Sequence, residues 1–148
     1  MKLLFTGVKL YGHIFKPINF SVQVMLIRDR QVVLVSHTYK SGWYFPGGGV
    51  KKKESLETAV RREAMEETGA TLESLQLVGV YTNLLGPTSD HITLFICHDF
   101  ELNGKSDEEI AEVKFFPLDQ LPQGIGRGTR CRIEEYLNGG QRPAFGEW

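Results

Sequence analysis

Runs of apolar residues that are rich in β-branched and aromatic side chains predict five short strands. The predicted strands cover residues 20–27, 32–35, 75–82, 91–100 and 113–116. Asp29-Arg30 separates the first two runs and predicts a turn, so these two strands are expected to form a hairpin. A loop that carries Gly86-Pro87 is expected to join the third strand to the fourth. Trp43-Tyr44-Phe45 is a short aromatic run that stops at Pro46.

Two segments are predicted to be helical. Residues 55–68 contain only good or neutral helix formers and are followed by Gly69, a residue type that commonly ends helices. Thr129 is expected to cap a second helix that continues through Leu137 and is closed by Asn138-Gly139-Gly140. Because strands and helices mix without a strict alternation, the sequence favours an α+β fold, layered as an α/β/α sandwich, over a Rossmann sheet.

The helix predicted over residues 55–68 carries acidic residues on the side expected to face the core. At about 100° per residue, Leu56, Ala59 and Val60 define its apolar side. Three glutamates project onto an overlapping arc, namely Glu63, Glu66 and Glu67. Like charges three or four residues apart repel, and more so when they are partly buried. A hard divalent cation such as Mg²⁺ would offset this repulsion, whereas a solvated acidic face is the alternative interpretation.

The composition is that of a soluble globular protein, with 41 % apolar and 24 % charged residues in a chain of 148. This length suits a single domain, predicted to span residues 1–148. The formal net charge of -1 gives no strong footprint for nucleic acid or an anionic membrane, and no apolar run reaches the ~18 to 20 residues of a membrane span. Cys97 and Cys131 match no metal or redox spacing, which favours a reduced, cytoplasmic location.

The strongest signal is a spacing that starts in the glycine run Pro46-Gly47-Gly48-Gly49. From Gly48 to Ala70 the chain satisfies the pattern G-x5-E-x7-R-E-U-x-E-E-x-G-U, in which U is an aliphatic position. This segment resembles the Nudix box of the Nudix (MutT-type) hydrolases, and all fixed Gly, Arg and Glu positions match. Both U positions are Ala, and Lys53 stands where many members have Gly. The first departure bears on helix packing and the second on the shape of the loop.

The resemblance implies an α/β/α sandwich with a mixed sheet, and hydrolysis of a nucleoside diphosphate linked to a further group. It also implies a divalent cation, Mg²⁺ or alternatively Mn²⁺. In the Nudix pattern the metal is held by glutamates and a glycine carbonyl, which correspond here to Glu63, Glu66, Glu67 and Gly48. Glu54 corresponds to the first glutamate of the box, Arg62 to the arginine that orients a box glutamate, and Gly69 to its last fixed glycine.

The expected chemistry is attack of water on phosphorus, with a carboxylate as the base. The box supplies no hydroxyl or thiol at a fixed position, so no covalent intermediate is expected. Glu63 is one candidate base. Glu109, with its neighbours Glu108 and Glu112, is the other, because these residues precede the strand predicted at 113–116. An acidic solvated loop is the alternative interpretation of these three residues.

The sequence says less about the substrate. Pro87 follows the box by 17 residues, near where ADP-ribose-hydrolysing members of the family carry a proline, although a proline in a loop is ordinarily a turn former. Tyr81 is a candidate to stack on a base, or else a core residue of its strand. His91 is a candidate substrate contact or an ordinary surface histidine. Basic residues near the second helix could meet phosphate or form a solvated face, namely Arg127, Arg130 and Arg132.

Two other functions stay open at this point. A non-catalytic Nudix-fold nucleotide-binding module would be expected to have lost box glutamates, and this chain has lost none. A same-fold isomerase would need a catalytic cysteine, whereas Cys97 lies in a predicted strand and is expected to be a small core residue. The partner is expected to be a small nucleotide or diphosphate substrate, and the sequence leaves monomer and homodimer open.

Overall fold

The computed structural model describes residues 18–85 and 88–148. The first three strands and the first helix described run in the order β1 (Ile18–Arg28), β2 (Gln31–His37), β3 (Gly47–Gly49) and α2 (Leu56–Thr68). Then follow β4 (Ala70–Leu72), β5 (Gln76–Asn83), β6 (Ser89–Cys97), β7 (Phe100–Leu102) and β8 (Ile110–Pro117). The chain continues through α3 (Arg127–Leu137) and β9 (Ala144–Glu147). No helix in these residues is long and apolar enough to cross a membrane.

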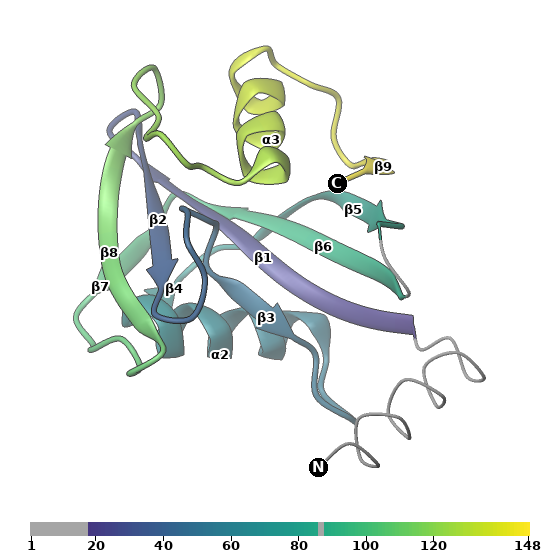
Figure 1. Cartoon of the computed structure of the whole chain (residues 1–148), viewed down its shortest axis with the longest axis horizontal. Helices are drawn as coiled ribbons and strands as arrows, with labels where there is room; N and C mark the ends of the chain where they lie inside the picture. The colour runs from purple at the N-terminus through teal and green to yellow at the C-terminus, as the bar shows by residue number, and fades with distance from the viewer. Residues whose placement is uncertain (1–17, 86–87) are drawn as a thin grey trace.

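The described strands build a mixed sheet whose order is β8-β2-β1-β6-β5-β9, with β3 paired to β1. β1 runs parallel to β6, and β5 runs parallel to β9, whereas β1–β2, β1–β3, β2–β8 and β5–β6 are antiparallel. β4 and β7 form a separate antiparallel pair. Figure 1 shows α2 on one side of the sheet and α3 on the other. The predicted α/β/α sandwich is thereby confirmed.

Alternation along β1 divides the core into two clusters. Val22, Val24 and Leu26 pack in the cluster that includes the buried residues of α2. Met25 and Ile27 point to the opposite face and pack in the cluster that includes Ile133 of α3. The two helices therefore cover opposite faces of β1, and the strand is buried on both sides.

Several predicted elements are confirmed with shifted ends, and others were missed. The strand predicted over 91–100 ends at Cys97, and a turn separates it from β7, whose Phe100 is 1 % exposed in the core. Gly47–Gly49 of the glycine run forms β3 against β1, a strand that was not predicted. β4, β7 and β9 were not predicted, because strands of three or four residues carry little periodic signal.

Two local predictions about the helices are wrong. Leu56 was placed on the apolar side of α2, yet it is 39 % exposed because the first helical turn extends past the core cluster. Thr129 was expected to cap α3, but the helix begins two residues earlier with Gly126 at its N-cap, and Thr129 is buried. Gly126 donates its N–H to the Trp43 carbonyl at 2.9 Å, which fixes the start of the helix from a distant loop.

Candidate active site

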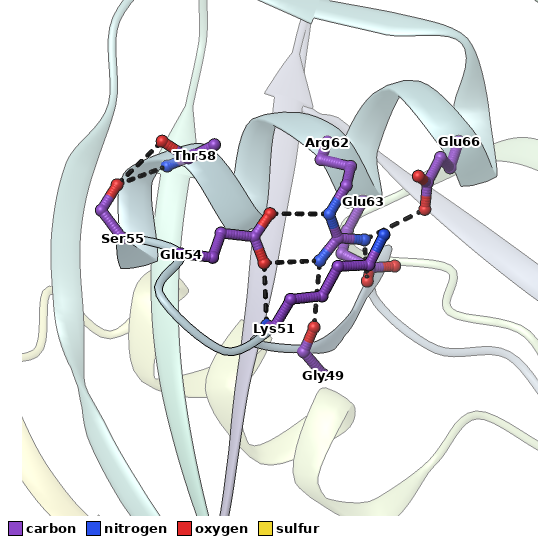
Figure 2. Close-up of polar contacts among 8 residues, drawn as sticks. All are labelled: Gly49, Lys51, Glu54, Ser55, Thr58, Arg62, Glu63 and Glu66. Carbon is purple, nitrogen blue, oxygen red and sulfur yellow. Dashed lines mark hydrogen bonds and ion pairs between the residues drawn. The ribbon is translucent and has the colours of Figure 1, made fainter.

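Local hydrogen bonds set the start of α2 and hold the loop before it. Ser55 is the N-cap, and its hydroxyl oxygen accepts a hydrogen bond from the Thr58 N–H at 3.1 Å. One residue earlier, the Glu54 carboxylate accepts the N–H of Lys51 at 2.9 Å (Figure 2). The other end of the helix is set by Gly69, which has φ of 70° and donates its N–H to the Ala64 and Met65 carbonyls. Both boundaries predicted from the sequence are therefore confirmed.

Arg62 is the hub of the polar network in Figure 2. Its Nε and Nη2 donate to the two carboxylate oxygens of Glu54 at 2.7 and 2.9 Å, a bidentate pair. Its Nη1 donates to Glu63 and, at 3.1 Å, to Glu66, and Nη2 also donates to the Gly49 carbonyl at 3.0 Å. The hydrogen bonds that Arg62 donates to the Glu54 carboxylate, and next the one from the Lys51 N–H, lower the pKa of Glu54 to about 2. The guanidinium thus ties three carboxylates to the glycine loop.

Glu67 points to the other side of this loop. Its carboxylate accepts the N–H of Gly47 at 2.9 Å, and its side chain is 13 % exposed. Burial is the main cause that raises the pKa of Glu67, and the nearby Glu63 and Asp107 carboxylates add to it. The Gly47 N–H and Lys40 oppose the rise, and the net result is a pKa of about 7. Glu63, Glu66 and Glu67 are half-buried rather than solvated, unlike Glu57 in the first turn of the same helix.

The Glu63 carboxylate lies beside Gly48. A Cβ at Gly48 would lie 2.6 Å from the Glu63 carboxylate, so this carboxylate uses room that only a glycine leaves. Within residues 18–85 and 88–148, however, no three acidic, histidine or cysteine side chains converge as metal ligands. Arg62 holds Glu63 and Glu66, while Glu67 lies against Gly47. The donor set fits Mg²⁺ or Mn²⁺ by its chemistry, and binding would require the glutamates to turn from these partners.

The end of β2 and the loop that follows it lie beside Glu67, and no residue there was predicted to belong to the site. The His37 Nδ1 is 3.9 Å from Glu67 Oε1, and it has no hydrogen-bond partner in the described residues. The His37 ring lies 5.1 Å from that of Tyr39 and 5.9 Å from that of Tyr44. Lys40 Nζ lies 4.0 Å above the Tyr44 ring. The only signal in the sequence was a cluster of polar and aromatic residues directly after β2.

The acidic segment before β8 also reaches the box. Asp107 donates its N–H to the Glu66 carbonyl at 2.8 Å, and the Glu109 carbonyl accepts the Thr38 N–H at 2.9 Å. Burial raises the pKa of the Tyr39 phenol, and the charges of Glu67, Glu109 and Glu63 raise it further. Glu109 and the box carboxylates therefore share one neighbourhood around Tyr39.

The two neighbours of Glu109 are placed differently. Glu108 is exposed, whereas Glu112 lies on β8 and forms an ion pair with Lys114. Of the three loop candidates, Glu109 is the one whose charge reaches the Tyr39 phenol together with those of Glu63 and Glu67.

The two described candidate substrate residues, Tyr81 and His91, lie on β5 and β6. Tyr81 is 2 % exposed in the core cluster beneath α3, so its proposed role as an open stacking surface is wrong. β5 turns this side chain inward because its register with β6 places Tyr81 opposite Ile92. His91 stacks on Phe20 with 5.5 Å between ring centroids, and its ring lies 3.3 Å from the Thr82 hydroxyl. Phe20 in turn lines a pocket together with Gly49 and Lys51 of the box. Pro87 lies outside the described residues.

Cys97 is a core residue, as expected. Its side chain is 1 % exposed, and its thiol donates to the Asp99 carbonyl at 3.1 Å. Burial raises the pKa of this thiol, which disfavours the reactive thiolate.

Comparison with known proteins supports the motif. The NUDIX domain family model matches residues 18–134. The chain is 37 % identical over 123 residues to a MutT-like protein of Streptomyces ambofaciens, covering 82 % of this chain and 78 % of that one. It is 30 % identical over 108 residues to an ADP-ribose pyrophosphatase of Methanocaldococcus jannaschii, covering 70 % of this chain and 64 % of the relative.

A solved structure has the same fold. The crystal structure of a MutT NUDIX hydrolase from Burkholderia pseudomallei superposes with a TM-score of 0.73 at 26 % identity. The match covers 80 % of this chain and 97 % of that one.

Proposed function

The chain belongs to the NUDIX family of hydrolases, and we propose that it cleaves the phosphoanhydride bond of a nucleoside diphosphate derivative in a metal-dependent reaction. The observation that carries this proposal is the network around Arg62, which ties Glu54, Glu63 and Glu66 to the glycine loop. Such a network gathers several carboxylates without burying unpaired charge. The geometry supports a working catalytic box rather than a binding module that has lost one.

We propose that Glu63, Glu66, Glu67 and the Gly48 carbonyl hold the cation, Mg²⁺ or Mn²⁺. When bound, the cation neutralises phosphate oxygens and lowers the pKa of the attacking water. The carboxylate oxygens at this site and the room beside Gly48 support this assignment. Arg62 keeps Glu54 in place through two hydrogen bonds, so the loop that carries Gly48 and Gly49 stays against the helix.

A carboxylate must take the proton of the attacking water. Glu63 and Glu109 are the two candidates for this base. Glu109 is supported by the effect of its charge on the Tyr39 phenol, which the charges of Glu67 and Glu63 also affect, and by the hydrogen bond that its carbonyl accepts from the Thr38 N–H. Glu63 is supported by its contact with Gly48 but is already paired with Arg62. Separate Glu63→Gln and Glu109→Gln variants, compared across pH, would assign the base.

The proposal is tested by assaying nucleoside diphosphate derivatives with Mg²⁺ and measuring release of monophosphate or phosphate. ADP-ribose belongs in this panel, because one relative is named an ADP-ribose pyrophosphatase. Glu66→Gln and Glu67→Gln should each lower the turnover rate by at least two orders of magnitude while the circular dichroism spectrum is unchanged. Glu57→Gln is a matched control on the same helix, since Glu57 is 66 % exposed and pairs only with Arg61 in the described contacts.

Near-wild-type turnover of the Glu66 and Glu67 variants at saturating Mg²⁺ would refute the site. Nucleotide binding without any turnover across the panel would favour the binding-module alternative.

A second experiment tests the direct attack of water. One turnover in ¹⁸O-labelled water, with enzyme in excess over substrate, should place one label in a product phosphate. A carboxylate nucleophile would give a covalent adduct that can be trapped on the protein, and hydrolysis of that adduct at the carboxyl carbon would leave the label out of the product of the first turnover. The labelled product also identifies which phosphorus is attacked.

A further inference from the structure

A cavity of about 250 Å³ lies on the α3 side of the sheet. It is enclosed by the end of β5 with the two residues after it, the first turns of α3, and Trp148, which follows β9. Its lining combines apolar, aromatic, amide and guanidinium groups, including Asn83, Leu84, Leu85, Arg127, Arg132 and Trp148. Leu84 and Leu85 are 66 % and 82 % exposed, so two large apolar side chains stand at this site. This mixture suits a flat aromatic ligand with polar substituents.

The indole of Trp148 is held as one wall of the cavity. Its backbone N–H donates to the Thr82 carbonyl at 3.1 Å, which extends the pairing of β9 with β5. Its ring packs edge-on against Phe45 and Tyr81, at 6.4 and 5.9 Å between centroids. A Cβ at Gly128 would lie 2.2 Å from the indole nitrogen, so a larger residue at this position of α3 would displace the ring.

Arg132 of α3 contacts the segment that carries Trp148. Its side chain is 8 % exposed, and its guanidinium donates to the Glu147 carbonyl at 3.1 Å and pairs with Glu135 at 2.9 Å. The same guanidinium lies 4.1 Å above the Tyr81 ring and 5.9 Å from the Trp148 ring. Arg132 therefore acts on the cavity as a positioning residue for Trp148.

The segment 45–47 connects this cavity with the acidic box. Phe45 packs against Trp148, and two residues later the N–H of Gly47 donates to the Glu67 carboxylate. Two residues of extended chain span about 7 Å. The cavity and the box are thus joined by two contacts of one short segment, Phe45 with Trp148 and Gly47 with Glu67.

We infer that this cavity receives the aromatic base of the substrate and that Trp148 is a specificity-determining residue that stacks on it. This inference rests on the proposed function, because it assumes that the diphosphate of the same molecule lies at the box. Stacking of a base on an aromatic side chain raises affinity by roughly fivefold to more than a hundredfold. The exposed Arg127 supplies a cation at the same cavity for the polar groups of the nucleotide.

Kinetics of Trp148→Leu test this inference, with Trp148→Phe as the conservative variant. Leucine keeps an apolar side chain but cannot stack, so KM for a nucleoside diphosphate substrate should rise at least tenfold while kcat changes less than threefold. Phenylalanine should restore most of the loss. Phe145→Leu is the matched control, because Phe145 lies on β9, just before Trp148, is 91 % exposed and is not part of the cavity lining. An unchanged KM in Trp148→Leu would overturn the inference.

A binding experiment separates this inference from the proposed activity. Adenosine monophosphate is titrated into wild-type protein while tryptophan fluorescence is recorded, with ribose 5-phosphate as the ligand without a base. We expect quenching by the nucleotide alone, loss of that quenching in Trp148→Phe, and its retention in Trp43→Phe. Quenching that persists in Trp148→Phe would refute the stacking role even in an active enzyme. Quenching that depends on Trp148 in a protein without turnover would support the cavity and refute the proposed hydrolysis.

Discussion

At the scale of single residues, Glu67 shows how burial and charge balance at the box. Its pKa is raised to about 7 by burial first and by Glu63 and Asp107 next, although the Gly47 N–H and Lys40 oppose the shift. The pKa of this carboxyl is about 7 in the folded protein and 4.5 in its unperturbed state. Between pH 4.5 and pH 7 the folded protein therefore binds a proton at Glu67 that the unfolded chain has lost. The free energy of unfolding should therefore fall as pH rises from about 4.5 to about 7.

We predict that Glu67→Gln removes this dependence in metal-free protein. Relative to the wild type, the variant should be more stable at pH 8 by on the order of 2 kcal/mol and about equally stable at pH 4.5. Burial lowers the pKa of the adjacent His37, whose contribution to stability rises with pH, so the difference between the two proteins is the quantity to compare. Urea unfolding in EDTA from pH 4.5 to 8 measures it.

Glu66→Gln is the control for this experiment, because the Glu66 side chain is 40 % exposed on the same helix. A difference between wild type and Glu67→Gln that stays constant with pH would contradict the assignment.

At the scale of elements, α2 depends on its ends as well as on its buried face. Gly69 ends the helix at φ of 70°, and its carbonyl accepts the N–H groups of Asn103 and Gly104 at 3.3 and 3.0 Å. A Cβ at Gly69 would lie 2.4 Å from the Gly104 carbonyl carbon. The last fixed glycine of the motif therefore joins the helix to the segment that leads to Glu109.

We predict that Gly69→Ala lowers the free energy of unfolding by about 2 kcal/mol or more, because the left-handed backbone and the contact with Gly104 both disfavour a side chain. Gly146→Ala is the matched control, since a Cβ there meets no atom within 4 Å. Urea denaturation of the two variants measures the difference. Equal stability of Gly69→Ala and wild type would show that the turn at 103–104 adapts freely.

At the scale of the whole molecule, the site couples helix α2, strand β3 and two loops that are distant in sequence. Gly47 precedes Glu67 by 20 residues, and Thr38 precedes Glu109 by 71. In the described residues, Arg62 pairs with Glu63 and Glu66, and Lys40 lies near Glu67. These two cations do not remove all of the repulsion among the three carboxylates. A cation bound only by the folded protein should therefore stabilise all of these elements together.

We predict that Mg²⁺ raises the melting temperature at pH 7.5. At ten to a hundred times the dissociation constant, the gain should be about 1–3 kcal/mol, or several degrees for a protein of this size. The combined Glu63→Gln, Glu66→Gln and Glu67→Gln variant should lose this gain. Thermal scans at constant ionic strength, with KCl as the control salt, measure the effect. A melting temperature that is the same with and without millimolar Mg²⁺ would count against the metal site.

The sequence by itself determined the features that depend on neighbouring residues. Ser55 and Gly69 set the ends of α2 through bonds within four residues, so both ends could be predicted. The helical repeat brings Glu63, Glu66 and Glu67 to one side for the same reason. The runs of β-branched and aromatic residues along β1 and β2 likewise predicted two strands, which only needed extension at their ends.

Only the tertiary structure decided which of these residues meet. The phenol ring of Tyr81 could stack on a base if it were exposed, but the register of β5 against β6 buries it beneath α3. His37 and Lys40 come to Glu67 because the chain after β2 folds back over the box, and Trp148 comes to Phe45 because β9 pairs with β5. Contacts of this kind are fixed by long-range packing and strand pairing, which a local pattern of residues does not encode.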